Sequence, residues 1–381
     1  MIKKCFLLYV LFALGVQAND FAFKLYNQLS EAEGNLFFSP ASIEAALSMT
    51  QEGARGNTQT QFFQTLENSD GIFPTVGTSV ILENANAIWV EKMFPILGTF
   101  KTAVTEKYGA KIRSADFSGQ PEAERLGINS WVEGKTHNKI QNLMPAGSVN
   151  AMTRLVLVNA IYFKGDWFHA FDKARTVNAP FHPPSPEGSG VTGALEKTVT
   201  VPMMTMKPKR FGYLENDCFQ CLELPYKGEE VSMLIILPRK NDGLAHIEQC
   251  FSAEKLDACT TPLRKTRVEV HLPRFKTASS FDLKQGLTAL GIEDAFDPAR
   301  ADFSGISGAR GLFIGAAVHK AFVEVNEEGT EAAAATGIGI GVTSMPMPPK
   351  IFRADRPFIF LIRENASGKI LFMGRITNPL K

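Results

Sequence analysis

The chain has 381 residues, of which 45% are hydrophobic and 21% are charged, with a formal net charge of +1. This is the composition of a globular protein, long enough for one large core or two smaller ones. The near-neutral charge gives no drive toward nucleic acid or an anionic membrane, so we expect neither as a partner.

Residues 1–18 have the pattern of a secretory signal peptide. Lys3 and Lys4 precede an apolar run, and Val16-Gln17-Ala18 supplies the small residues of a cleavage site. The run is too short to span a bilayer. We therefore expect a secreted, extracellular chain that begins near Asn19.

Four cysteines follow the predicted signal, namely Cys218, Cys221, Cys250 and Cys259. Cys218 and Cys221 form a CxxC pair without a second pair or a nearby histidine, which argues against zinc. Whether Cys250 and Cys259 form a disulfide is an open question at this point. So few cysteines make no disulfide framework, and packing must stabilise the fold.

Apolar periodicity predicts an early helical part. Ser39 precedes Pro40, which is the signature of a capped helix start. Residues 153–164 form a long apolar strand interrupted by Asn159, whose buried amide needs hydrogen bonds. The other predicted helices span 20–29, 59–67, 94–108, 122–139, 244–258 and 283–290, and the other strands 82–90, 199–206, 218–224, 231–237, 267–272 and 313–325. No linker or repeat divides the chain, so we expect one α+β domain over residues 19–381.

Residues 327–349 differ from an ordinary loop. From Thr330 the sequence alternates with the period of a β-strand, so that Thr330, Ala332, Ala334 and Thr336 share one face. Three prolines, the last at Pro349, then prevent pairing. The segment alone indicates either a flexible Gly/Ala linker or an exposed loop that can become a strand.

Several segments resemble one family. Residues 322–336, FVEVNEEGTEAAAAT, resemble the hinge of an inhibitory serpin, and the block 35–43, the Asn159 strand and residues 352–360 and 371–379 resemble further serpin segments. The resemblance runs from about Phe21 to Lys381. It implies three β-sheets, about eight helices and an exposed reactive-centre loop at about 327–349.

Familiar catalytic patterns are missing. The sequence has no HExxH, P-loop or GxSxG motif, and its six histidines do not occur at metal-ligand spacing. We therefore expect no catalytic residues, no metal and no cofactor, and predict that the chain is not an enzyme.

The resemblance implies a secreted inhibitor of serine proteases, acting by suicide. The protease cuts the loop and forms an acyl-enzyme, and the loop then inserts into the main sheet and traps the protease in a covalent complex. The hinge would be Glu327, Glu328, Gly329, Thr330, Glu331, Ala332, Ala333, Ala334, Ala335 and Thr336. The alternatives are a non-inhibitory serpin that binds or carries a ligand, and an inhibitor of a cysteine protease.

The resemblance also implies a reactive bond at Thr343–Ser344, when the loop length common in the family is counted from Gly329, with Ile340, Val342 and Ser344 as other cut positions. No Lys or Arg lies between Thr330 and Pro349, which argues against trypsin-like targets. Elastase-, chymotrypsin- or subtilisin-like proteases are favoured.

The resemblance assigns two further groups of residues. Ser39, Ser42, Asn159 and His319 would be the shutter that joins two central strands, unless they are plain core polar residues. Trp167, Arg274 and Glu327 would form the breach where the loop enters, unless the ion pair is a surface salt bridge worth about 0–1 kcal/mol.

Two surface features complete the expectations. Residues 68–82 contain no Lys or Arg and leave no room for the helix that binds heparin in some serpins, so we expect no heparin site there. Asn365 lies in an Asn-Ala-Ser sequon and is a predicted glycosylation site. We expect a monomer.

Overall fold

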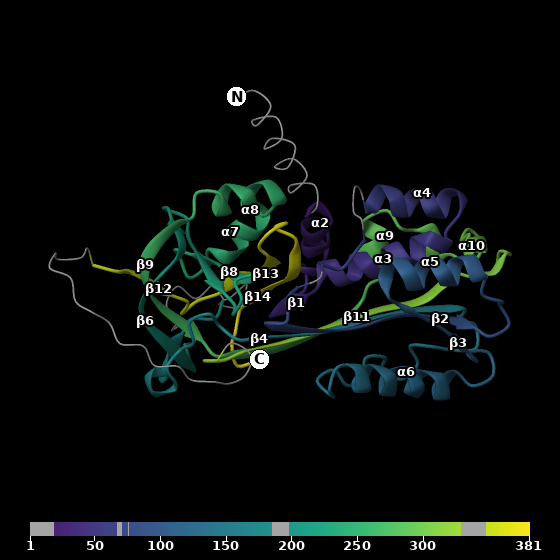
Figure 1. The fold of residues 1–381 in the computed structure, drawn as a ribbon, viewed down its shortest axis with the longest axis horizontal. Helices are drawn as coiled ribbons and strands as arrows, with labels where there is room; N and C mark the ends of the chain where they lie inside the picture. Colours follow the sequence, from purple (N-terminus) through teal and green to yellow (C-terminus); the bar gives the residue numbers. More distant parts are fainter. Residues whose placement is uncertain (1–18, 67–70, 75, 185–197, 329–347) are drawn as a thin grey trace, which may run out of the picture.

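The computed structural model describes residues 19–66, 71–74, 76–184, 198–328 and 348–381. Figure 1 shows a mixed arrangement of helices and strands, in agreement with the predicted α+β class. The described helices are α2 (Asp20–Leu29), α3 (Pro40–Gly53), α4 (Gly56–Thr65), α5 (Gly98–Tyr108), α6 (Pro121–Lys135), α7 (Leu244–Gln249), α8 (Ala253–Thr260), α9 (Lys284–Ala289), α10 (Ser304–Ser307) and the short 3-10 helices η1 (Lys173–Arg175) and η2 (Asp294–Phe296).

The described strands form two hydrogen-bonded sheets. One has five strands in the order β10-β11-β4-β2-β3, and the other has nine, in the order β1-β14-β13-β8-β7-β6-β9-β12 with β5 paired to β6. The strands are β1 (Leu36–Phe38), β2 (Val80–Glu91), β3 (Lys111–Ala115), β4 (Leu155–Gly165), β5 (Val177–Phe181), β6 (Val199–Glu215), β7 (Phe219–Pro225), β8 (Val231–Pro238), β9 (Arg264–Pro273), β10 (Phe275–Asp282), β11 (Ile314–Val325), β12 (Lys350–Arg353), β13 (Phe358–Glu364) and β14 (Ile370–Ile376).

Strand β6 explains why two sheets are found among the described residues where three were expected. Its pairing with β9 shifts register between Met206 and Lys209. Before this bulge β6 also pairs with β5, and after it with β7. Because a bulge bends a strand without ending it, β6 makes one continuous sheet of strands that could otherwise count as two.

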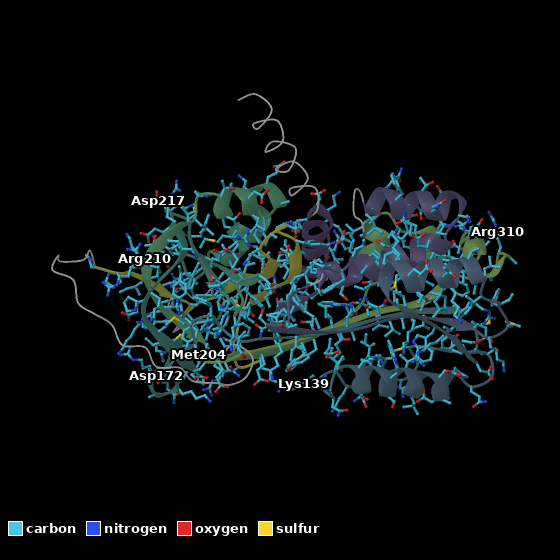
Figure 2. The ribbon with its side chains drawn as sticks, in the orientation of Figure 1. Lys139, Asp172, Met204, Arg210, Asp217 and Arg310 are labelled. Carbon is cyan, nitrogen blue, oxygen red and sulfur yellow. The ribbon has the colours of Figure 1, made fainter. Side chains whose placement is uncertain are left out.

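The five-stranded sheet separates two helical layers. In Figure 1, α6 lies on one face of β2, β4 and β11, and α3, α5 and α9 lie on the other. Figure 2 shows side chains filling both layers and the interior of the nine-stranded sheet at the opposite end, where Met204 is labelled. Among the described residues no helix is long and apolar enough to cross a membrane.

The predicted elements agree with the structure except at their boundaries. The helix expected at 94–108 begins only at Gly98, because Leu97 has an extended backbone and its N–H donates to the Ile306 carbonyl at 2.8 Å. The helix expected at 244–258 is two helices, since Phe251 turns into the core and Ser252 caps α8 through the Lys255 N–H. On α6, Val132 is buried and Trp131 is half-buried.

Candidate functional site

The centre of the five-stranded sheet is a parallel pair, β4 and β11. The two strands lie in register from Ala316 opposite Val156 to Phe322 opposite Tyr162, with His319 opposite Asn159. β10 pairs antiparallel with the other edge of β11. We call the boundary between β4 and β11 the seam.

A buried group of polar side chains crosses the seam. The imidazole Nδ1 of His319 is hydrogen-bonded to the Asn159 side-chain oxygen, and Asn159 Nδ2 donates to the Ser42 carbonyl (2.8 Å), to Ser42 Oγ (2.7 Å) and to Asn86 Oδ1. Ser39, Ser42, Asn159 and His319 are all 0% exposed. With Asn86 they form what we call the seam cluster.

The start of α3 positions this cluster. Ser39 caps the helix by accepting a hydrogen bond from the Ser42 N–H at 3.1 Å, as the sequence predicts, and Pro40 follows at the first helical position. The Ser39 hydroxyl also donates to the Leu371 carbonyl of β14 at 2.6 Å. Its backbone N–H donates to His319 Nε2 at 3.1 Å. The cap therefore links α3 to both sheets.

These bonds determine the state of His319. Because Nε2 accepts from the Ser39 N–H, the proton of the neutral ring lies on Nδ1, which donates to Asn159. Burial lowers the pKa of His319 to about 3. The imidazole is thus neutral at physiological pH, and charging it would break the bond from Ser39.

A second group surrounds the end of β11, where the chain leaves the sheet. The Glu327 side chain is 2% exposed and pairs with Arg274, which follows β9, while the Thr176 hydroxyl donates to the same carboxylate oxygen. Burial opposes ionisation of Glu327, but the hydrogen bonds from Arg274 and Thr176 outweigh it, so its pKa lies below the ordinary value. The carboxylate is therefore ionised, with both of these bonds made to its Oε1.

Backbone bonds hold the same residues. The Trp167 N–H donates to the Glu328 carbonyl at 2.9 Å, and the Phe171 N–H donates to the Glu327 carbonyl at 2.7 Å. The indole N–H of Trp167 donates to the Asn326 carbonyl at 3.0 Å. Residues 326–328 are therefore attached to the segment that follows β4. We call Trp167, Phe171, Thr176, Arg274, Glu327 and Glu328 the junction site.

Aromatic packing supports the junction site. Trp167 is stacked on Tyr226, with ring centroids 4.5 Å apart and an interplanar angle of 11°. Trp167 is 4% exposed, whereas Phe168 beside it is 46% exposed. Glu328 forms an ion pair with Lys173, from the short helix η1 next to Asp172, which Figure 2 labels.

The structure thus brings together each predicted pair and cluster that it describes. Ser39, Ser42, Asn159 and His319 form one group, and Trp167, Arg274 and Glu327 form another. Their roles as shutter and breach stay predictions. The hinge from Gly329 to Thr336 and the reactive bond Thr343–Ser344 lie outside the described residues, as does the predicted signal at 1–18.

Sequence reasoning missed three contributors. Asn84 and Asn86 alternate along β2 and point toward Ser42, with oxygens 3.5 and 3.4 Å from its hydroxyl. Their period-two spacing in a largely apolar strand was a usable signal. Thr176 gave no such signal, because its partner Glu327 lies 151 positions later in the sequence.

The structure also describes the other predicted features, namely the glycosylation site, the segment 68–82 and the cysteines. Asn365 is exposed in the turn between β13 and β14, and its amide nitrogen donates to the Glu229 carbonyl at 2.7 Å and to Ser232 Oγ at 2.9 Å. Glycosylation there stays a prediction. The described part of residues 68–82 contains no helix. All four described cysteines are free thiols, so the Cys250–Cys259 disulfide is not formed in this structure.

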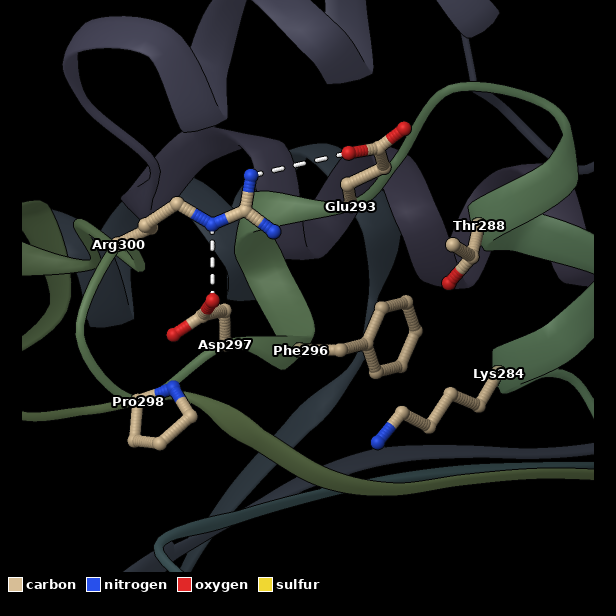
Figure 3. A pocket seen from close by; sticks show the side chains of 7 residues that line it. All are labelled: Lys284, Thr288, Glu293, Phe296, Asp297, Pro298 and Arg300. Carbon is tan, nitrogen blue, oxygen red and sulfur yellow. Dashed lines mark hydrogen bonds and ion pairs between the residues drawn. The ribbon is translucent and has the colours of Figure 1, made fainter.

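A further cavity, away from the seam and the junction site, does not resemble a catalytic site. It measures about 390 Å³ and is lined by residues around α9 and η2. Figure 3 shows Arg300 pointing to Asp297 and Glu293 across it, with Lys284 on the opposite wall. Its acidic groups are already paired with Arg300. Among the described residues no group of three or more His, Cys, Asp or Glu could hold a metal ion.

Comparison with known proteins agrees with this geometry. Residues 16–379 match the family model described as Serpin (serine protease inhibitor). The leukocyte elastase inhibitor of Homo sapiens is 45% identical over 380 residues, covering 94% of this chain and 97% of that protein.

Solved structures show the same fold. The crystal structure of uncleaved ovalbumin superposes with a TM-score of 0.83 at 30% identity, covering 96% of this chain and all of that one. Serpin48 of the insect Tenebrio molitor gives 0.81 at 34% identity, with coverage of 96% and 98%.

The relatives also correct one prediction. The missing catalytic motifs predict that the chain is not an enzyme. This is a purely negative statement about catalysis. The curated relatives are named as inhibitors of an elastase. We therefore replace this negative prediction with a positive one: the chemistry to consider is that between an inhibitor and a protease.

Proposed function

Since the chain belongs to the serpin family, we propose that it is a secreted suicide inhibitor of an elastase-like serine protease. The observation that carries this proposal is the position of residues 326–328. They leave the end of β11 and are attached at the junction site, at the end of the seam where β4 also ends. A strand formed by the residues that follow would enter the sheet at the seam, between β4 and β11.

Sheet topology supports that destination. A segment that turns back after Val325 pairs antiparallel with β11, and β10 already occupies one edge of β11. The other edge faces β4 in a parallel pair, the pairing that is slightly less stable per residue. Insertion at the seam would replace one parallel pair by two antiparallel pairs.

The proposed chemistry is that of an interrupted peptide hydrolysis. The serine hydroxyl of the protease attacks the carbonyl carbon of Thr343, an ester bond forms, the Thr343–Ser344 peptide bond breaks, and the proton passes to the new amino group of Ser344. Water would normally cleave the ester. Insertion of residues 329–342 moves the attached protease away before that step is complete, and the complex persists.

Two independent features support an elastase-like target. Val342 and Thr343 are small and uncharged, so they suit a small apolar specificity pocket. The relatives in horse, human and pig are named leukocyte elastase inhibitors. Secretion is supported by residues 1–18.

Incubation with a protease panel tests the proposal. The purified chain is mixed with the serine proteases elastase, chymotrypsin, subtilisin and trypsin and with the cysteine protease papain, and analysed on denaturing gels. We expect a covalent complex with elastase and cleavage after Thr343, and no complex with trypsin. Clean cleavage of the loop by every protease, without a complex and without a rise in thermal stability, would instead support a non-inhibitory binding protein. A complex formed only with a cysteine protease would replace the target class.

A further inference from the structure

A second pocket lies between helices α7 and α8 and strands β7 and β8 of the nine-stranded sheet, away from the seam (Figure 1). Its volume is about 220 Å³, and its apolar wall is formed by Phe219, Ile236, Ile247 and Phe251. A dry apolar cavity of about 150 Å³ already holds a molecule of benzene. The pocket is therefore large enough for one ring or a short hydrocarbon chain. We call it the thiol pocket.

The wall of the thiol pocket is part of the main core. Phe251 meets Phe23 of α2 edge to face, with centroids 4.9 Å apart at 81°, and Tyr26 at 5.7 Å and 75°. The Tyr26 hydroxyl donates to Glu248 Oε1 of α7 at 2.6 Å. Phe251 and Ile236 both belong to the same buried cluster as these helix residues. The pocket is thus formed before any ligand arrives.

Three of the four described cysteines line this pocket. Cys218 lies immediately before β7, Cys250 immediately after α7, and Cys259 within α8. All three are free thiols with at least part of the residue exposed. Thiolates that bind one metal ion converge on a point about 2.3 Å away, and no described group of three such residues could hold a metal. The thiols therefore surround the space, where they can react with a molecule that enters it.

The local environment favours Cys250 as the nucleophile. Burial raises the pKa of the Cys259 thiol, and the Lys255 ammonium offsets this only in part. Burial also raises the pKa of Cys221, the cysteine outside the pocket. Cys250 is exposed, and His246 lies one helical turn before it and lines the same pocket. An imidazole beside a thiol can take its proton and so supply the thiolate that reacts.

An amine completes the set of reactive groups. Lys255 of α8 lines the pocket, and no carboxylate is among the described residues that do so. Its positive charge also offsets the negative carbonyl end of α7, where Cys250 lies. The pocket therefore combines a soft nucleophile, a base, an amine and an apolar wall.

We propose that the thiol pocket is a covalent binding site for small α,β-unsaturated aldehydes that carry an apolar tail. The tail packs against Phe219, Ile236, Ile247 and Phe251, the electrophilic β-carbon meets Cys250, and the aldehyde faces Lys255. Each part of such a molecule has a complementary group in the pocket. The site is separate from the seam and does not depend on the loop insertion proposed above.

The capture takes two steps, and neither needs an oxidant. His246 takes the proton of the Cys250 thiol, and Sγ then bonds to the β-carbon while the C=C π bond breaks. The electron pair passes to the carbonyl oxygen as an enolate, whose α-carbon recovers the proton from His246. The neutral amine of Lys255 next adds to the aldehyde carbon, and water leaves to give an imine.

Rates of adduct formation test the role of the apolar tail. The full mature chain is incubated with octenal (the α,β-unsaturated isomer) or with acrolein, which lacks the tail, and adducts are located by peptide mass spectrometry. Free glutathione gives the intrinsic reactivity of each aldehyde. We expect the ratio of the octenal rate to the acrolein rate to be at least about tenfold higher at Cys250 than in glutathione. Octanol, which has a tail but no electrophile, should slow the octenal reaction.

Three variants assign the groups. Cys250→Ser should lose the octenal reaction that octanol suppresses, whereas Cys218→Ser, a change of the same kind at the rim of the same pocket, should stay within about twofold of the parent. Borohydride fixes an imine as a stable link between Cys250 and Lys255. Lys255→Gln should keep the thioether and lose this link, and retention of the link would overturn the role of Lys255.

Three results would overturn the site itself. One is a parent protein whose octenal-to-acrolein ratio at Cys250 equals that of glutathione, which needs no variant to fold. Another is equal reaction at Cys218 and Cys250 that octanol leaves unchanged. The third is protein purified without reductant in which the pocket thiols are already joined in a disulfide. Trapping of elastase is a separate measurement, so these results leave the proposed inhibitor function standing.

Discussion

Asn159 and His319 lie directly opposite each other in the parallel pair β4–β11 and are joined by a side-chain hydrogen bond in addition to the backbone ladder. Both side chains are fully buried, and each has further partners on α3. The seam is therefore closed by specific polar bonds. Polar bonds depend on protonation and geometry, so the strength of this closure can be changed by pH and by single substitutions.

Acidification should weaken the native state through His319. Its pKa in the fold, about 3, lies below the usual value of about 6.5. Between these values the unfolded chain binds the proton that the folded chain excludes, so stability falls as pH drops below 6.5. The expected cost is about 2–3 kcal/mol at pH 4.5. Denaturant unfolding at a series of pH values measures it.

The matched control uses two histidine variants. In His319→Gln the pH dependence should be smaller by roughly that amount. His246→Gln, which changes an exposed histidine far from the seam in sequence, should keep the parent slope. Identical slopes for all three proteins would show that His319 has no part in the acid sensitivity.

The Ser39 cap should be worth more than an ordinary cap. Ser39→Ala removes the cap of α3 and the bond to Leu371, for an expected loss of about 2–3 kcal/mol in unfolding free energy. Ser252→Ala removes only the half-exposed cap of α8, for about 0.5–1 kcal/mol. Thermal and denaturant melts compare them. An equal cost would mean that the bond to Leu371 contributes nothing.

At the junction site, removing the cation should cost more than removing the anion. Arg274→Ala leaves the buried Glu327 carboxylate with only Thr176, whereas Glu327→Gln leaves a half-exposed guanidinium free to be hydrated. We expect about 1–3 kcal/mol for the former and about 1 kcal/mol or less for the latter. Arg274→Lys should restore most of the loss. A larger effect of Glu327→Gln would contradict this order.

The ion pair at Glu327 also has a pH signature of its own. Because the pKa of Glu327 in the fold lies below its ordinary value, its contribution is present above about pH 4.5 and is lost as pH falls through the folded pKa. This loss begins only below about pH 4.5, whereas the loss through His319 begins near pH 6.5. The difference between parent and Glu327→Gln should therefore shrink only at the acid end of the titration, as denaturant melts can show.

Target choice should follow the residue before the cut. Thr343→Arg supplies the basic side chain that a trypsin-like specificity pocket binds. We expect complex formation with trypsin to rise by about 100-fold and that with elastase to fall by a similar factor. Second-order inhibition rates measure both. If the rates are unchanged while Val342→Arg changes them, the reactive bond lies one residue earlier.

Much of the fold was predictable because its signals are local. The cap at Ser39-Pro40 and the apolar run around Asn159 each report their own element. The family resemblance then named the residues that meet at the seam and the junction. The bulged strand β6 and the break at Phe251 were missed, because tertiary packing and not the local pattern determines them.

The unpredicted parts of the site depend on distant contacts. Thr176 meets Glu327, and Arg113 meets Trp131, only once the sheet and α6 are assembled. No spacing in the sequence encodes either contact. Asn84 and Asn86 were within reach of the same reasoning that identified Asn159, since polar residues alternating in a buried strand need partners.

The central claim, that the segment after β11 enters the sheet and traps the protease, is tested most directly by Ala334→Pro. Proline lacks the N–H that a strand in the middle of a sheet must donate, so the variant should be cut by elastase at the parent rate and form no covalent complex. Ala333→Ser, on the opposite face, should trap as the parent does. An Ala334→Pro protein that captured elastase as efficiently as the parent would contradict the account.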